Sequence, residues 1–152
     1  MQQLLNPDLA DYPNFVAGGA VISRLSPDGA TLAVLCAGQN NLYKPDGSPD
    51  LDNTTQYIFL YDVSGANKQQ PKLIKVVKQK NAHVGLVWAP DGNTFYATGG
   101  KDDAVYVYSK GGDKLNTIAL GHGNKGVGLG VLPNAGGLAI SADGKTLVPQ
   151  LF

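Results

Sequence analysis

The chain contains 152 residues, enough for one domain whose core buries about 70% of the surface that the unfolded chain exposes. Its 12 basic and 12 acidic residues cancel to a formal net charge of +0, which argues against nucleic acid or an anionic membrane as a partner. The single cysteine, Cys36, excludes an internal disulfide and a cysteine-rich zinc site. It lies in the apolar run TLAVLCAG, where we expect a buried and unreactive side chain.

The composition also indicates the fold class. Twenty glycines and nine prolines separate short apolar runs, and no stretch of ten or more residues shows a helical period. The first residues, 1–19, have neither the basic region of a signal peptide nor the apolar length of a membrane span. We therefore predict an all-β chain without a visible export signal, and we predict no cofactor.

A hairpin unit recurs three times, as VISRLSPDGATLAVL (21–35), VGLVWAPDGNTFYAT (84–98) and GLAISADGKTLV (137–148). Each copy is an apolar strand, a four-residue turn ending in Asp-Gly, and a second strand. In such a turn proline fixes φ at the first central position, aspartate favours the next, and glycine accepts a positive φ. We expect the aspartates of these turns to be structural and not catalytic.

Two further strands follow each of the first two copies. YIFLYDV (57–63) corresponds to VYVYSK (105–110), and KLIKVVKQ (72–79) corresponds to KLNTIAL (114–120). The repeating unit is thus a four-stranded antiparallel meander, whose strands we name A to D in chain order. A four-stranded unit that recurs after about 40 residues plus insertions is typical of a β-propeller blade.

Parts of the chain resemble a known family. APDGNTFYATGGKDDAVYVYSKGGDKLNTIAL, followed by GLAISADGKTLV, is similar to the YVTN-type β-propeller repeat of lactonase-like and cytochrome d1-like propellers. VISRLSPDGATLAVLCAGQNNLY and YIFLYDVSG resemble the N-terminal propeller part of bacterial propeller–phosphoesterase proteins. The resemblance implies a β-propeller fragment of four-stranded antiparallel blades and a periplasmic or exported ancestor. It implies little about function, because blade motifs are scaffold.

We interpret residues 1–152 as a single partial propeller domain, comprising an N-terminal segment (1–19), blade 1 (20–80), blade 2 (81–120), and a linker with an incomplete blade 3 (121–152). Such propellers close with about six or seven blades, so we expect a truncated relative of a longer chain. Pro149 removes a ladder donor and predicts that the last strand does not continue regularly. Unpaired blade edges predict a homo-oligomer, in which residues 14–19 complete a partner's blade.

The stretch GHGNKG (121–126) matches the G-x-G-x-x-G spacing of a dinucleotide-binding loop. That motif requires a following helix, whose N-terminal amides bind the pyrophosphate. Here VGLGVLPNAGG follows, and its glycines and proline cannot begin a helix. We therefore reject a dinucleotide site and interpret the stretch as the link from strand D of blade 2 to strand A of blade 3.

In an antiparallel meander the B-to-C and D-to-A links lie at one end, and the A-to-B turns lie at the other. The long links 38–56 and 121–135 therefore share one face, together with the short links 99–103 and 80–83. Long loops on one face of a repeat scaffold are where binding usually occurs. We expect any ligand site on this face, and the sequence leaves its small-molecule ligand open.

Four residues of this face are candidate ligand-binding residues. His122, Asn124 and Lys125 place an imidazole and an ammonium beside loop amides, which suits an anion or a channel mouth, and the alternative is a solvated loop. His83 begins an A strand at the same end, where a hydrogen-bonded structural histidine is the alternative. Two histidines without a supporting cluster predict no metal site.

One stretch of the first long link has the spacing of a calcium loop. Asp46, Ser48, Asp50 and Asp52 alternate as oxygen ligands do in such a loop. Pro49 interrupts the pattern, and the twelfth position is not a glutamate. A polar turn is the preferred interpretation, with calcium as the alternative.

The aromatic residues of the predicted strands are expected to pack between blades, namely Phe59, Tyr61, Trp88, Tyr106 and Tyr108. No Ser/His/Asp order and no paired carboxylates occur in a context that would assemble a nucleophile or a general acid and base. We therefore predict no catalytic residue.

The sequence favours a non-catalytic propeller fragment that acts as a self-associating scaffold or binding module, with a ligand face formed by the 38–56 and 121–135 links. One alternative is a lactonase-like hydrolase whose site forms only when copies close a ring. Another is a remnant of a longer gene without a function of its own.

Overall fold

The computed structural model describes residues 4–122 and 134–152. Within these residues the chain forms ten strands and one 3-10 helix, which are β1 (Ala20–Leu25), β2 (Thr31–Cys36), β3 (Gln56–Asp62), η1 (Gly65–Lys68), β4 (Lys72–Gln79), β5 (Leu86–Trp88), β6 (Thr94–Thr98), β7 (Ala104–Ser109), β8 (Lys114–Ala119), β9 (Ala135–Ile140) and β10 (Leu147–Leu151). In these ranges no helix has the length and apolar character needed to cross a membrane. The predicted all-β fold class is confirmed.

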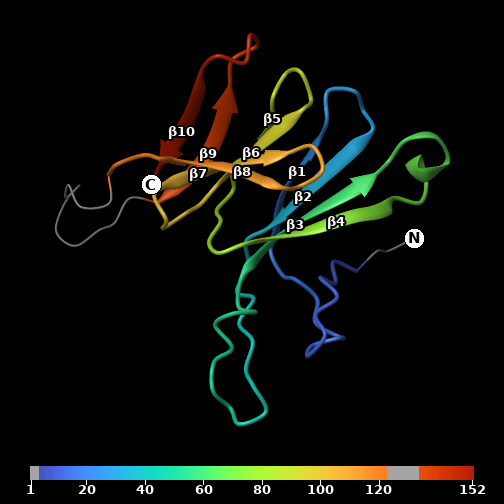
Figure 1. Ribbon diagram of the computed structural model, residues 1–152, viewed down its shortest axis with the longest axis vertical. Coiled ribbons are helices and arrows are strands. Elements are labelled where there is room, and N and C mark those ends of the chain that lie inside the picture. Colours follow the sequence, from blue (N-terminus) through green and yellow to red (C-terminus); the bar gives the residue numbers. More distant parts are fainter. Residues whose placement is uncertain (1–3, 123–133) are drawn as a thin grey trace.

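The strands form three antiparallel sheets, which we name sheets 1 to 3 (Figure 1). Sheet 1 has the order β1-β2-β3-β4, sheet 2 has the order β5-β6-β7-β8, and sheet 3 pairs β9 with β10. Neighbours along the chain are therefore neighbours in each sheet, as the repeat predicted. The sheets succeed one another through contacts of β5 with β1 on one side and with β9 on the other, which is a propeller-like arrangement.

The three A-to-B turns have one common structure. Gly29, Gly92 and Gly144 have φ angles of 70°, 71° and 72°, where a residue with a side chain is strained. Each turn also touches the next one. A Cβ atom on Gly92 would lie 3.5 Å from Cδ of Pro27, and one on Gly144 would lie 3.3 Å from Cδ of Pro90. The three hairpins point the same way in Figure 1, so the turns repeat in space as they do in the sequence.

The larger core lies between sheets 1 and 2. Its buried side chains come from both sheets and are Ala33, Leu35, Ile58, Leu60, Val77, Leu86, Trp88, Phe95, Ala97 and Tyr108, with Tyr106 packed against them. The ring of Phe95 lies between Trp88 and Tyr108, with both centroid distances 5.1 Å. The Trp88 Nε1–H also donates to the carbonyl of Arg24 in sheet 1 over 3.1 Å. Packing of Trp88, Tyr106 and Tyr108 between the sheets is therefore confirmed.

Phe59 and Tyr61 are buried, but the expectation that they pack between blades is wrong. Side chains alternate along a strand, and Ile58 and Leu60 of β3 occupy the side that faces sheet 2. Phe59 and Tyr61 therefore belong to a second core on the opposite side of sheet 1. The N-terminal segment contributes five residues to this core, namely Leu5, Leu9, Tyr12, Phe15 and Ala17.

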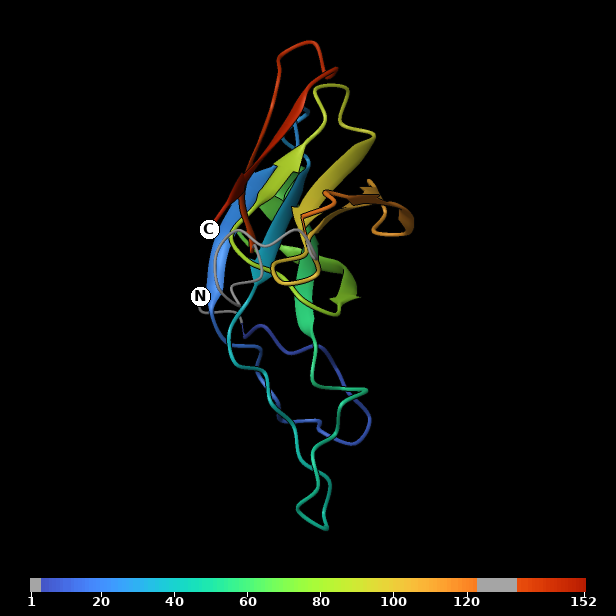
Figure 2. The same ribbon diagram turned by 90° about the vertical axis from the view of Figure 1, so that its left-hand side faces the viewer.

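Gly18 and Gly19 pair with the end of β2 in their own chain. The N–H groups of Ala37 and Gly38 donate to the carbonyls of Gly19 and Gly18 over 2.9 and 3.1 Å. The approach is so close that a Cβ atom on Gly38 would lie 2.6 Å from the carbonyl carbon of Gly18. The N-terminal segment thus covers the outer side of sheet 1, and it continues beside the 38–56 link beyond the sheets (Figure 2).

Strand β10 continues through Pro149, but its pairing is irregular there, as the sequence predicted. Pro149 lies opposite Leu138 of β9, and the register shifts only between Pro149 and Leu151. An edge strand has one side without ladder hydrogen bonds, so a residue that lacks an N–H is tolerated there. Within the described residues β10 pairs with β9 alone, which makes it such an edge.

Candidate functional site

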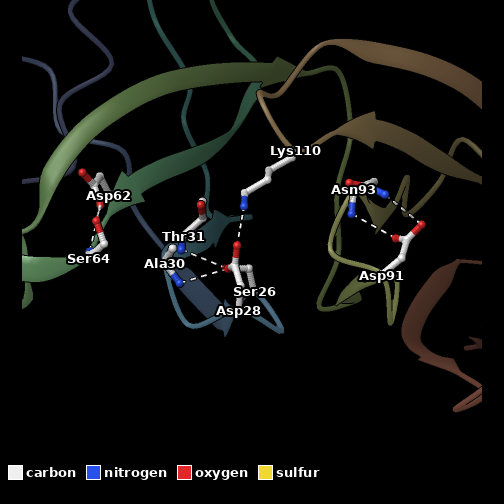
Figure 3. A network of polar contacts seen from close by, with 9 residues as sticks. All are labelled: Ser26, Asp28, Ala30, Thr31, Asp62, Ser64, Asp91, Asn93 and Lys110. Carbon is white, nitrogen blue, oxygen red and sulfur yellow. Dashed lines mark hydrogen bonds and ion pairs between the residues drawn. The ribbon is translucent and has the colours of Figure 1, made fainter.

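The turn end of the sheets carries carboxylates that cap their own turns (Figure 3). Asp28 accepts hydrogen bonds from the Ser26 hydroxyl over 2.6 Å and from the Ala30 N–H over 3.0 Å, and it pairs with the ammonium of Lys110 from sheet 2. The Lys110 contact, followed by the Ser26 and Ala30 hydrogen bonds, holds the pKa of Asp28 well below its ordinary range. Asp28 therefore stabilises its turn and links two sheets.

The other two turns repeat this pattern. Asp91 accepts the N–H of Asn93 over 3.0 Å, and Asp143 accepts the Ser141 hydroxyl over 2.6 Å and the N–H of Lys145 over 3.1 Å. Each carboxylate is bound to groups within two residues of itself. These contacts support the prediction that the turn aspartates are structural.

The B-to-C and D-to-A links lie at the opposite end of the sheets, as the topology predicted. The D-to-A link between β4 and β5 spans residues 80–85 in the structure. In it, the Asn81 side chain donates to Oδ1 of Asp102 in the B-to-C link 99–103 over 2.7 Å. The backbone N–H of His122 donates to the carboxylate of Asp103 in that same link. The links of both four-stranded sheets are thus in direct contact at this end.

A buried polar network holds these links in place. Gln79 at the end of β4 donates from Nε2 to the carbonyls of Asn81 and Thr98, over 2.7 and 2.9 Å, and accepts the Tyr108 hydroxyl over 2.9 Å. The Thr98 hydroxyl in turn donates to the carbonyl of Gly136 in β9 over 2.7 Å. The network therefore connects all three sheets, and a satisfied buried network is a rigid support for nearby loops.

A cleft of about 350 Å³ opens beside this network. It lies between the 38–56 link, whose far end projects away from the sheets in Figure 1, and the two short links 80–85 and 99–103. Eight residues line it, namely Asn41, Leu51, Thr54, Thr55, Gln56, Lys80, Asn81 and Lys101. Its volume falls in the lower part of the range of small-molecule pockets, about 300–1,000 Å³.

The cleft brings together two ammonium groups. Lys80 and Lys101 are both exposed, and neither forms an ion pair with a described residue. Asp102 follows Lys101 in the chain, but its two oxygens accept hydrogen bonds from Asn81 and from the Tyr106 hydroxyl, each over 2.7 Å. Burial, and then the Asp102 contact, raises the pKa of Tyr106, so its phenol remains a donor to Asp102. The two lysines of the cleft therefore carry positive charges that no described carboxylate pairs with directly.

The amide groups of the cleft offer both donors and acceptors, because the Asn81 Nδ2 group is engaged with Asp102 and its Oδ1 atom is an acceptor. Oε1 of Gln56 accepts from the Nδ2 group of Asn40 over 3.0 Å, and among the described residues the Gln56 NH2 group has no acceptor. The Thr55 hydroxyl is buried and has no hydrogen-bond partner among the described residues. The arrangement can therefore hold a group that supplies hydrogen-bond acceptors.

Two of the residues predicted for a ligand site, His83 and His122, are not among the residues that line this cleft. The ring of His83 stacks on Phe152 with a centroid distance of 5.5 Å, and its Nδ1 atom is buried without a partner among the described residues. Nδ1 of His122 lies 3.1 Å from Oδ1 of Asp103, a non-glycine residue with a φ of 49°. Asn124 and Lys125, like most of the G-x-G-x-x-G stretch, lie outside the described residues.

The acidic residues of the 38–56 link serve separate turns. Asp46 accepts the N–H and the hydroxyl of Ser48 over 2.9 and 2.6 Å. Asp50 accepts Nδ2 of Asn53 over 2.8 Å and the Tyr12 hydroxyl over 2.9 Å, and the Asn53 contact, which outweighs desolvation, lowers the pKa of Asp50. In the part of the chain that the structure describes, no three His, Cys, Asp or Glu side chains gather around a metal-sized space.

Sequence reasoning missed the three residues of the cleft that carry its charge and its support. Lys80, Asn81 and Lys101 lie on short links, and loop length was the criterion that selected candidates. A usable signal was present in the sequence. Each short link of this face contains a lysine, and the meander places both links at one end.

Comparisons with known proteins assign no ligand to the cleft. No protein-family model matches the chain, and no curated protein matches it. Among solved structures the chain is similar to Kuenenia stuttgartiensis hydrazine synthase, with a TM-score of 0.48 and 21% sequence identity. The similarity covers 88% of this chain and 42% of that chain, so this chain spans less than half of that protein's length. The function is therefore argued from the cleft itself.

Proposed function

We propose that the chain is a propeller-like binding module whose ligand site is the cleft between the 38–56, 80–85 and 99–103 links. The observation that carries the proposal is that Lys80 and Lys101, which form no ion pair with a described residue, both line a cleft between the links of the two four-stranded sheets. The Gln79 network beneath the links supports a preformed site, because it fixes their backbone before any ligand arrives.

The chemistry of the cleft favours binding over catalysis. The eight lining residues include no histidine, cysteine, serine or carboxylate that would serve as a nucleophile or a general base. The alternative, a lactonase-like hydrolase that forms only in a closed ring, requires such groups to come from other copies. We also propose that the repeat is of the YVTN type, which the Asp-Gly turn geometry of all three sheets supports.

A fragment screen by NMR tests the binding proposal. The ¹⁵N-labelled chain is screened against a library that contains neutral, cationic and anionic fragments. We expect hits of at least one class to shift the amide signals of Thr55, Gln56 and Asn81, and Lys101→Trp to abolish these shifts by filling the cleft. Lys68→Trp on the remote helix η1 is the control. A library without cleft hits, or hits that persist in Lys101→Trp, would sink the proposal.

We further propose that copies of the chain self-associate through the open edge of sheet 3. Within the described residues β10 has a ladder partner on one side, and Val148 and Phe152 beside it are 57% and 62% exposed. Free strand edges with apolar side chains pair with other edges. We expect light scattering across a concentration series to show a discrete dimer or trimer that Val148→Lys dissociates, whereas a monomer at every concentration contradicts the proposal.

A further inference from the structure

We infer that the cleft binds a small anion and holds its carboxylate or phosphate group between the ammonium groups of Lys80 and Lys101. The inference rests on the proposed function and adds the chemical class of the ligand. It follows from the charges of the cleft, from its balance of donors and acceptors, and from its size.

The charge of the cleft selects an anion. The eight lining residues carry two positive charges and no negative one, in a chain whose formal net charge is +0. Asp102 is not among the lining residues, and its carboxylate accepts hydrogen bonds from Asn81 and Tyr106. A cationic ligand would therefore meet two ammonium groups and no carboxylate in the lining, whereas an anion gains charge-assisted hydrogen bonds.

The hydrogen-bond inventory points the same way. Each lysine offers three donors and no acceptor, and among the described residues the Gln56 NH2 group has no acceptor, while its Oε1 atom accepts from Asn40. A ligand that binds these groups supplies several acceptor oxygens on a compact centre. Carboxylate and phosphate groups have this property.

The links that carry the two lysines are joined to one another. Lys80 precedes Asn81 and Lys101 precedes Asp102, and the side chains of Asn81 and Asp102 are hydrogen-bonded over 2.7 Å. Gln79 anchors the first link to β6 through the carbonyl of Thr98. The site therefore loses little backbone entropy when the anion binds, which favours affinity for a small ligand.

The size of the cleft limits the ligand. A volume of about 350 Å³ accommodates a molecule of metabolite size. Leu51, which is 77% exposed at the rim, offers an apolar contact to the remainder of such a molecule. We therefore assign the cleft to a small organic acid or a small phosphate-bearing molecule.

Titration of the full chain with two probes tests the inference and separates the two anion types. Inorganic phosphate and succinate are added to the ¹⁵N-labelled protein at an ionic strength held constant with sodium chloride. We expect at least one probe to shift the amide signals of Thr55, Gln56 and Asn81 in a saturable way. The tighter probe identifies the anionic group of the ligand.

Variants show whether the lysines bind the probe. Lys80→Ala and Lys101→Ala are each expected to weaken binding at least about tenfold, the loss typical of one charge-assisted hydrogen bond. Lys80→Arg should restore most of the affinity, and Lys68→Ala on η1 should leave it unchanged. The dispersed spectrum of each variant verifies that it is folded. Equal affinity in the wild type and both alanine variants overturns the inference.

The outcome also separates this inference from the proposal on which it rests. If the amide signals of Thr55, Gln56 and Asn81 shift with neutral or cationic fragments but with neither anion, the anion inference is wrong and the binding-module proposal stands. If these amide signals shift with no fragment and with neither probe, both the anion inference and the binding-module proposal are wrong. Shifts that follow chloride concentration instead of the probe show ionic-strength effects alone and also overturn the anion inference.

Discussion

The hydroxyl of Tyr108 donates a hydrogen bond of 2.9 Å to Oε1 of Gln79 and thereby joins strand C of sheet 2 to strand D of sheet 1. Both residues are 2% exposed. Burial, with Tyr106 nearby, raises the pKa of Tyr108, so the phenol keeps the proton that it donates. This one contact connects the core between the sheets to the links that form the cleft.

Tyr108→Phe should lower the free energy of unfolding by about 1–3 kcal/mol, because it leaves the buried Gln79 oxygen without a donor. Urea unfolding measures the change. Tyr96→Phe is the matched control, since Tyr96 is half-buried and its hydroxyl bonds to no described residue. In Tyr108→Phe/Gln79→Leu the two losses should be less than additive, and strict additivity would show that the pair is not coupled.

Gly38→Ala should detach the N-terminal segment from sheet 1. Its Cβ atom would meet the carbonyl carbon and oxygen of Gly18 at 2.6 Å, and backbone atoms cannot move aside without breaking the adjacent hydrogen bonds. We expect a loss of about 1–3 kcal/mol in unfolding free energy and faster proteolysis of the first residues. Gly111→Ala, whose nearest contact would be 3.8 Å, should match the wild type. Equal protease resistance of both variants argues against a tightly packed segment.

Cys36 should resist thiol reagents in the folded protein. Its side chain is fully buried in the second core, and burial raises its pKa to about 11, so little thiolate exists at pH 8. Ellman's reagent should report almost no reactive thiol in buffer and one per chain in concentrated urea. Stoichiometric reaction under native conditions would mean that the N-terminal segment opens freely.

Asp28 should make stability depend on acid pH. Its pKa in the folded state is lowered, chiefly by Lys110, so its contribution is fully present above the unfolded-state value of about 3.9 and declines as pH falls below it. Asp28→Asn should therefore melt at a lower temperature than the wild type near pH 7, and the difference should shrink between about pH 5 and about pH 2. A difference that stays constant over this range contradicts the ion pair. Asp52→Asn, an exposed residue of the 38–56 link, is the control.

The repeated turns could be predicted from the sequence because their physics is local. Proline, aspartate and glycine at consecutive positions specify a tight turn, and alternation of apolar residues specifies the strands on either side. Strand β4 was predicted to the residue, and β3, β7 and β8 to within one residue at each end. The irregular pairing of β10 after Pro149 was also predictable, because proline has no N–H to donate to a ladder.

The location of the candidate site followed in part from topology. The meander alone places the links of both sheets at one end, which is where the cleft lies. The lengths of the links did not predict which of them line the cleft. Lys80 and Lys101 meet there because Gln79 and Asn81 tie the short links together, and those hydrogen bonds join residues up to 21 positions apart.

The sequence by itself determined that this chain forms four-stranded antiparallel sheets joined by repeated Asp-Gly turns, because turn chemistry and strand alternation act between neighbouring residues. Only the tertiary structure decided which side of sheet 1 receives Phe59 and Tyr61, since the covering residues lie more than forty positions away in the N-terminal segment. It likewise decided which polar groups pair, because pairing depends on how sheets and links pack in space, and Lys80 and Lys101 of the cleft form no ion pair with a described residue.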